Sequence, residues 1–418
     1  LQKQPARWRR VGSHRTGMGS ATVLVVFGVI GLLDSLHYRP ALVAPTGEPM
    51  AAASRQGTAY SVEVLSLLDR LLASLRVRSE KTYSEPLATR GYAKEAIDLR
   101  DADGRLRQIR DYPRLKYGGA HLGDDEARRY ADIVQRLLQA LALAAAIWCT
   151  LAGVTVAVLA RAGDCTLRAA WRRIWRNQTD FAWNAVLIVL ACLLACALPL
   201  AGLADDYHVF GTDKVGQDVL YQILKSVRTA LVIGLVTTLV MLPLAVVLGV
   251  MAGYFRGWVD DLIQYLYTTL SSIPGVLLIA AAVLMMQVLI DTHPQWFATA
   301  AERADLRLLA LCLILGLTSW TGLCRLLRGE TLKLRELEFI QAAQAFGVAD
   351  LRIIARHIVP NLMHIVIIAL VMDFSSLVLA EAVLSYVGIG VDPTMISFGT
   401  MINNARMELA REPMVWWS

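Results

Sequence analysis

The sequence has few charged residues for its length. Only 18% of the 418 residues are Asp, Glu, Lys or Arg, whereas 56% are hydrophobic. Ordinary soluble domains contain about 25% charged residues. The charges here are confined to a few stretches between long apolar runs. This composition excludes a soluble enzyme, a disordered chain, a collagen-like repeat and a coiled coil, and it predicts an all-α polytopic membrane protein.

The sequence also lacks the motifs of nucleotide hydrolysis and of common hydrolases. None of the 29 glycines is followed by lysine, so there is no Gly-x-x-x-x-Gly-Lys phosphate loop. Neither His-Glu-x-x-His nor Gly-x-Ser-x-Gly occurs. The six cysteines form no Cys-x-x-Cys pair, which argues against a zinc site or a disulfide framework. We therefore expect no catalysis, no cofactor and no metal on this chain.

Seven apolar runs predict helices that cross a bilayer. They lie at about 20–36, 137–160, 181–203, 229–253, 262–290, 306–325 and 360–387. The first run is the weakest, because it is short, Asp34 closes it, and its basic start also fits a signal peptide. Pro243 and Pro274 interrupt two runs, and each predicts a kink that shapes helix packing or serves as a hinge.

The distribution of Lys and Arg predicts the orientation. With the N-terminus in the cytoplasm, the inner segments hold 17 of these residues and the short outer loops hold 7. The prediction is therefore a cytoplasmic N-terminus at 1–19, a periplasmic segment at 37–136 and a cytoplasmic linker at 161–180.

The periplasmic segment contains enough apolar clusters to predict a small α or α+β domain. Helical spacing of Val and Leu predicts an amphipathic helix over 61–76. A weaker Asp-Gly signal at residue 103 predicts a hairpin. From Asp124 or Asp125, each a suitable N-cap, one helix is expected to run directly into the second span.

The polar stretch from Arg328 to Pro360 is too patterned for a simple connection. A first short helix is predicted at about 335–346, and Gly347 supplies a permissive turn. Asp350 is expected to cap a second helix. The first helix carries Phe339, Ala342, Ala343 and Phe346 at i, i+3, i+4 and i+7. Its small residues favour close approach by another protein.

The same stretch resembles the Glu-Ala-Ala…Gly…Ile-x-Leu-Pro signature of permease subunits in ABC importers. The matching residues are Gln341-Ala342-Ala343, Gly347 and Ile358-Val359-Pro360. Gln341 replaces glutamate, His357 replaces isoleucine and Val359 replaces leucine. These changes preserve helix compatibility and argue only against an ion pair at position 341.

Two further segments resemble the oligopeptide/dipeptide type of these permeases. They are Phe210-Gly211-Thr212-Asp213 with Gly216, Asp218 and Val219, and Leu384 to Gly390. Together with Trp171-Arg172-Arg173, the resemblance covers roughly 171–418. The family core has six helices and five are present here, so we expect a last helix to follow Trp416 and Trp417, a pair typical of the membrane interface.

The resemblance implies a permease subunit of a bacterial ABC importer in the inner membrane, with its transmembrane domain at 181–418. It would form the translocation pathway for peptides or similar small solutes. The implied partners are a second permease subunit in a heterodimer, two ATP-binding cassette subunits, a periplasmic substrate-binding protein and membrane lipid, but no nucleic acid. ATP and Mg would bind to the partner ATPases.

The resemblance also implies that the loop 328–360 couples the permease to the ATPases. The expected coupling residues are Glu338, Gln341, Ala342, Ala343, Phe346 and Gly347. Ionised carboxylates are costly in a membrane span, so Asp373, Ser376 and Glu381 are candidates for the pathway. Glu381 equally fits a carboxylate that is solvated or paired near the outer surface.

A basic segment before the third span carries Arg168, Arg172, Arg173 and Arg176 interleaved with Trp171 and Trp175. It predicts either a helix along the lipid headgroups or a device that fixes topology.

Two other functions are alternatives to the importer. A secondary transporter would show two related halves with broken helices, and no such repeat is evident. A membrane receptor would use the periplasmic segment for sensing, but it needs a cytoplasmic signalling module, which the sequence after 161 does not contain.

Overall fold

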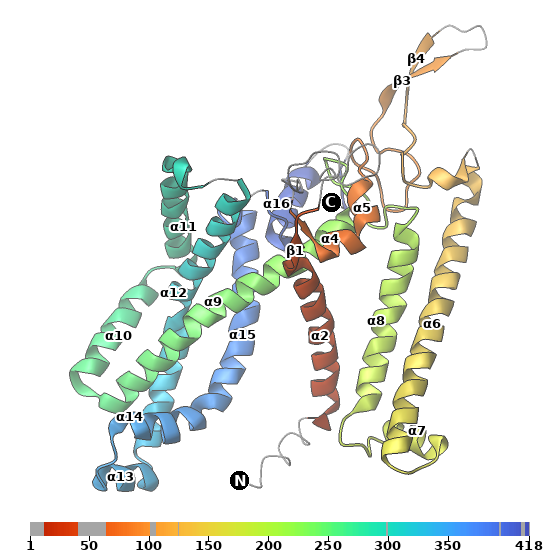
Figure 1. Cartoon of the computed structure of the whole chain (residues 1–418). Coiled ribbons are helices and arrows are strands. Elements are labelled where there is room, and N and C mark those ends of the chain that lie inside the picture. The colour runs from red at the N-terminus through yellow and green to blue at the C-terminus, as the bar shows by residue number, and fades with distance from the viewer. Residues whose placement is uncertain are drawn as a thin grey trace, which may run out of the picture. The chain divides into compact units, whose positions relative to one another are not determined.

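The computed structural model describes residues 12–40, 64–100, 106–123, 125–297, 300–392, 394–410 and 414–417. Within these ranges, seven helices are long and apolar enough to cross a membrane, as Figure 1 shows in outline. The chain forms two compact units. Unit 1 comprises Leu1–Lys225 and Val415–Ser418, and unit 2 comprises Ser226–Met414.

Three membrane helices and one short crosswise helix make up most of unit 1. They are α2 (Arg15–Ser35), α6 (Arg129–Ala162), α7 (Leu167–Trp175) and α8 (Trp183–Ala204). Helices α6 and α8 run side by side, α7 lies across their ends, and α2 packs on α8 (Figure 1). Buried Val156, Ile174 and Leu187 join α6, α7 and α8 in one apolar core. The predicted continuous helix into the second span is confirmed, since a 3-10 turn at Glu126–Arg128 leads into α6.

The segment between α2 and α6, called here the insertion, contains both helices and strands. Its elements are β1 (His37–Tyr38), β2 (Leu65–Ser66), α4 (Leu67–Leu71), α5 (Ala73–Val77), β3 (Glu95–Arg100) and β4 (Leu106–Asp111). Strands β3 and β4 pair antiparallel, as the Asp-Gly signal predicts, although the turn itself lies outside the described residues. The single helix predicted over 61–76 is wrong in its described part. Ser66 starts α4 with a capping box, and the chain breaks at Leu72 before α5 begins.

A buried ion cluster ties α2 to the insertion and to the first residues of α9. Lys225 Nζ lies 2.8 Å from Asp34 Oδ1 and 2.9 Å from Asp69 Oδ1. Burial acts to raise the pKa of Asp69, but hydrogen bonds from Ser66 and Tyr221 and the Lys225 charge together lower it to about 2. Because removing one partner of a buried pair costs about 3–5 kcal/mol, α2 is an integral part of the unit.

Unit 2 is built from long helices and a patterned loop. Its helices are most of α9 (Val219–Phe255), α10 (Gly257–Ser272), α11 (Gly275–Thr292), α12 (Ala300–Arg335), α13 (Glu338–Ala345), α14 (Asp350–Ile353), α15 (Val359–Tyr386) and α16 (Phe398–Leu409). The predicted span 262–290 is two helices, because Pro274 holds Ile273 in an extended conformation and so ends α10. Pro243, by contrast, lies within an uninterrupted α9.

Two glycines allow α9 and α12 to pack with their backbones in close approach. A Cβ at Gly249 would lie 2.8 Å from Cys324 O, and a Cβ at Gly253 would lie 2.7 Å from Arg328 O. The four-residue spacing places both glycines on one face of α9, as in small-x-x-x-small helix pairs of membranes. Any larger side chain at either position must push the helices apart.

We predict that Gly253→Leu destabilises the protein by about 1–3 kcal/mol, because the added atoms meet α12 backbone that cannot move aside. The measurement is the thermal unfolding midpoint of purified protein in detergent. The matched control is Gly322→Leu on α12, where an added Cβ meets nothing within 4 Å. Equal midpoints for the two variants would contradict the close approach.

Candidate functional site

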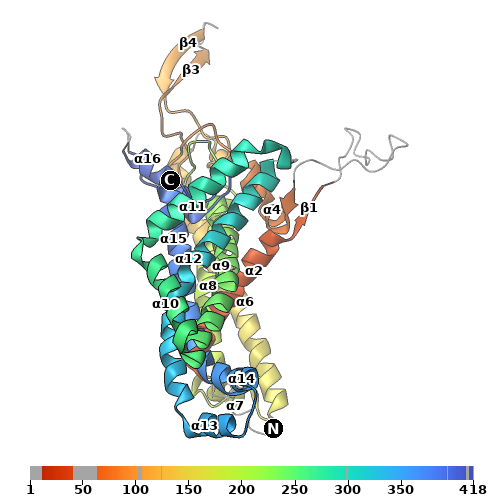
Figure 2. The same cartoon turned by 90° about the vertical axis from the view of Figure 1, so that its left-hand side faces the viewer.

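The helix α13 is the centre of the predicted coupling loop. Figure 2 shows it crosswise to α12, beyond the end of that helix. Leu337 precedes it, Phe346 follows it, and Gly347 turns the chain at φ 69°. The backbone N–H of Val348 donates to Ala343 O at 3.1 Å, which closes the C-terminal turn. The two predicted short helices are thus present, with α14 as the second.

Contacts on both sides fix α13 within unit 2. Ile340 is fully buried in the core that also contains residues of α9, α12 and α15. Gln344 Nε2 donates to the Tyr254 hydroxyl at 3.2 Å. Arg256, in the turn after α9, pairs with Glu336 just before α13. An isolated helix of this length is unstable in water, so these contacts are what hold it as a rigid element.

The remaining face of α13 is exposed and largely apolar. Phe346 is 86% exposed and Phe339 is 48% exposed. Of the six predicted coupling residues, Glu338, Gln341, Ala342, Phe346 and Gly347 are exposed and Ala343 is half-buried. Gln341 Nε2 donates to the backbone oxygen of Glu336 at 3.3 Å, so its amide stays within the loop.

The predicted capping role of Asp350 is wrong. The cap position is Ala349, and Asp350 is the first residue of α14. Its Oδ1 instead accepts a 2.6 Å hydrogen bond from the Tyr254 hydroxyl. The carboxylate therefore connects the loop to α9. After α14 the chain continues through a π-helical turn at Ile354–Ile358 into α15.

The three candidate pathway residues have different surroundings on α15. Asp373 is half-buried and Ser376 is exposed. Glu381 is 1% exposed, and its Oε1 accepts hydrogen bonds from Ser385 at 2.7 Å and from Ser397 at 3.0 Å. Ser397 is also the N-cap of α16. Glu381 thus connects α15 to α16, which agrees with the alternative of a paired carboxylate.

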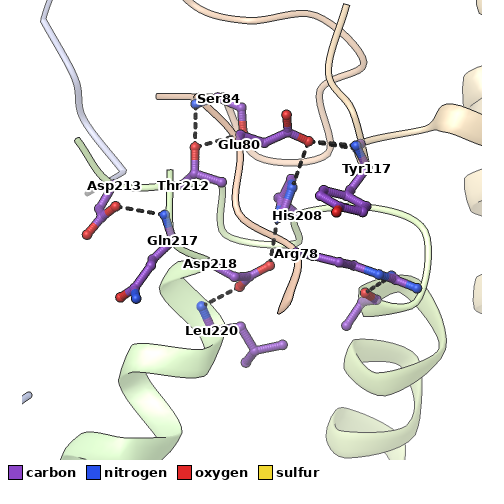
Figure 3. A network of polar contacts seen from close by, with 12 residues as sticks. Arg78, Glu80, Ser84, Tyr117, His208, Thr212, Asp213, Gln217, Asp218 and Leu220 are labelled. Atoms are coloured by element: carbon purple, nitrogen blue, oxygen red, sulfur yellow. Dashed lines mark hydrogen bonds and ion pairs between the residues drawn. The ribbon is translucent and has the colours of Figure 1, made fainter. Parts of the chain in front are cut away.

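A second polar site lies in unit 1, where the insertion forms hydrogen bonds with the loop between α8 and α9 (Figure 3). We call this site the clasp, formed by residues 78–92 and 113–119 around residues 205–218. Backbone bonds join the two segments, including Glu80 N–H to Gly216 O at 2.9 Å and Leu87 N–H to His208 O at 2.9 Å. Thr212 Oγ1 accepts from the Ser84 N–H at 2.7 Å.

His208 lies between two carboxylates at the centre of the clasp. Its Nδ1 is 2.8 Å from Asp218 Oδ2, its Nε2 is 3.4 Å from Glu80 Oε1, and all three side chains are at most 5% exposed. Burial lowers the pKa of His208, but Asp218 and Glu80 outweigh it and raise the pKa to about 9. Burial also acts to raise the pKa of Glu80, but hydrogen bonds with His208 and with the backbone N–H groups of Lys116 and Tyr117 lower it. A positively charged imidazole therefore bridges the two segments.

The clasp also explains the glycines of the predicted motif. Gly211 and Gly216 adopt φ of 76° and 78°. A Cβ at either would overlap the backbone of the insertion, at Ser84 and Glu80 respectively. Trp417 donates through Nε1 to Thr212 O at 3.2 Å and is 9% exposed. The interpretation of Trp416 and Trp417 as an interface pair therefore holds at most for Trp416, since Trp417 packs within unit 1.

Comparison with known proteins decides the family. Residues 245–416 match the family described as binding-protein-dependent transport system inner membrane component. The oligopeptide transport system permease protein OppC of Mycobacterium tuberculosis is 32% identical over 259 residues, which are 59% of this chain and 83% of the relative. The chain belongs to the ABC importer permeases of the oligopeptide/dipeptide type.

Other relatives agree with this membership. The glutathione transport system permease protein GsiD of Pectobacterium atrosepticum is 30% identical over 60% of this permease and 84% of the relative. The dipeptide transport system permease protein DppC of Bacillus subtilis is 26% identical over 56% of this permease and 72% of the relative. As a member of this family with seven apolar helices in its described ranges, the permease is a multi-pass inner membrane protein.

The sequence motif contains some residues of the clasp in this permease but not all of them. Thr212, Gly216 and Asp218 belong to the motif quoted for the family resemblance. Glu80 and His208 carried no sequence signal, because no motif joins residues 128 positions apart. Only the pairing of a buried imidazole with two carboxylates reveals them.

We predict that the clasp weakens at alkaline pH. The folded-state pKa of His208 is about 9 and its ordinary value is 6.5, so the protonated ring stabilises the fold fully below about pH 6.5. This contribution, on the order of 3 kcal/mol, is lost as the pH rises through about 9. Thermal unfolding and limited proteolysis of the insertion between pH 6 and 10 measure it.

His208→Gln should lower the unfolding midpoint at pH 7 and flatten its pH dependence between 7 and 10. The control is His37→Gln, which changes an exposed histidine of the same unit. A His208→Gln protein with the wild-type pH profile would show that the buried imidazole is not the titrating group.

Proposed function

We propose that this permease forms the translocation pathway of an ATP-driven importer and couples it to cytoplasmic ATPases through α13. The cargo would be peptides or similar small solutes, the class named for its relatives. A second permease subunit, two ATP-binding cassette subunits and a substrate-binding protein would complete the importer. ATP and Mg would bind to the ATPases.

The observation that carries the proposal is the contrast between the two faces of α13. One face is anchored by fully buried Ile340, whereas the other exposes Phe346 and Phe339. Aromatic side chains, Phe included, are enriched at protein interfaces relative to the rest of a protein surface. A pushed α13 would also move α9 and α12, because the same core contains their residues.

The orientation follows from the same assignment. ATPases act in the cytoplasm, so α13 belongs on the cytoplasmic side. The count of 17 inner against 7 outer Lys and Arg residues supports the same orientation, with the N-terminus inside. The insertion would then lie in the periplasm. Asp373 and Ser376 are the better candidates for the pathway, since Glu381 is enclosed by Ser385 and Ser397.

We predict that Phe346→Ala weakens ATPase binding without unfolding the permease. Loss of an interface hot spot costs about 2 kcal/mol or more, which is about a 30-fold loss of affinity. The side chain is 86% exposed, so few internal contacts are lost. Co-purification with the cognate ATPases, cargo-stimulated ATP hydrolysis and uptake into vesicles measure the effect.

Ala343→Pro should have a stronger effect, because proline breaks α13. It should abolish uptake and cargo-stimulated ATP hydrolysis and leave membrane insertion intact. The matched control for Phe346→Ala is Trp296→Ala, which removes an aromatic side chain of 57% exposure between α11 and α12 and should leave ATPase binding unchanged. Normal transport by Ala343→Pro would refute the coupling role. A secondary transporter or a receptor would co-purify with no ATPase.

A further inference from the structure

One cavity of unit 1 has no part in the proposed transport function. It is a groove of about 490 Å³ between α6 and α7. Its lining includes Trp148, Gly153, Val156, Arg168, Trp171 and Arg172. The walls are therefore apolar along α6 and the ring of Trp171, and two guanidinium groups stand at the α7 side.

The groove is open because α6 has no side chain at Gly153. A Cβ there would meet nothing within 4 Å. At Gly249 and Gly253, by contrast, the missing side chain is replaced by a neighbouring helix. Gly153 is also exposed, so it brings no helices of the described chain together. The space beside it is wide enough for an elongated apolar group.

Helix α7 is positively charged and anchored on one face. Ala170 and Ile174 are buried against the core of α6 and α8. Arg168 and Arg172 are exposed, and neither forms an ion pair with any residue that the structure describes. The helix itself contains no acidic residue. Trp171 and Trp175 pack edge to face at 5.6 Å beside the arginines.

This combination of charge and shape fits one class of ligand. A guanidinium group binds phosphate oxygens with paired N–H donors. Arg168 and Arg172 have no carboxylate or phosphate partner among the described residues. Tryptophan rings and arginines gather where a helix meets lipid headgroups. An apolar groove whose lining includes two arginines without an ion-pair partner in the described part of the chain matches a molecule with a phosphate at one end and a hydrocarbon chain at the other.

We propose that the groove is a binding site for an anionic phospholipid. Arg168 and Arg172 hold the phosphate and the acidic headgroup. One acyl chain lies against Trp148, Gly153 and Trp171. The bound lipid fills the space between α6 and α7 and so supports the position of α7 across the ends of α6 and α8.

The test is lipid binding by the purified full chain. The protein is stripped of lipid in a neutral detergent and titrated with phosphatidylglycerol or with phosphatidylcholine of the same acyl chains. Native mass spectrometry counts the bound molecules. Arg168→Gln/Arg172→Gln should weaken phosphatidylglycerol binding roughly 30-fold, since each basic side chain near an anionic lipid surface contributes about one factor of five. Phosphatidylcholine binding should change little.

Two controls separate a built site from general surface charge. Arg173→Gln/Arg176→Gln removes the same charge from the same segment but outside the groove lining, and it should retain phosphatidylglycerol binding. Gly153→Leu fills the groove and should abolish binding, whereas Gly28→Leu, at another open glycine, should not. Equal loss in both arginine pairs, or normal binding by Gly153→Leu, would overturn the proposal. The glycine variants keep the test valid if an arginine variant fails to fold.

Discussion

Unit 1 depends on buried charged side chains that are paired with one another inside the unit. His208 bridges Glu80 and Asp218, and Lys225 bridges Asp34 and Asp69. The first cluster joins the insertion to the loop between α8 and α9, and the second joins it to α2 and α9. A charge taken out of water is tolerated only when its partners are close, so these clusters specify one arrangement of the insertion. The positive-φ glycines of the α8–α9 loop serve the same arrangement, since they let the two backbones touch.

Unit 2 is organised by close backbone packing instead. Gly249 and Gly253 bring α9 against α12, and Ile340 anchors α13 in the core that these helices share. A short helix without this anchor would not persist. The same packing that orders α13 leaves Phe339 and the adjoining Phe346 exposed, so the buried anchor Ile340 and the proposed binding surface lie close together in the chain but face different surroundings. The proposed coupling follows from this division of roles.

Glycine has three distinct roles in the permease. At Gly253 it permits helix contact, at Gly216 it permits a turn beneath the insertion, and at Gly153 it leaves space that no described residue fills. The first two roles stabilise the protein from within. The third belongs to the proposed lipid site, where a ligand would supply the missing volume. Arg168 and Arg172, which form no ion pair with a described residue, are the reason for proposing an anionic ligand.

The sequence by itself determined the membrane class, the helical elements and the family, because hydrophobic run length and short motifs are local properties. It placed α13 and Gly347 closely and the start of α6 within a few residues. It did not predict the break in the helix at 61–76, the break at Pro274 or the true partner of Asp350. Those outcomes depend on capping, on the residue before a proline and on a tyrosine of another helix. The partnership of Glu80 with His208 was decided by tertiary structure alone, since only folding brings residues so distant in the chain within hydrogen-bonding range and removes them from water.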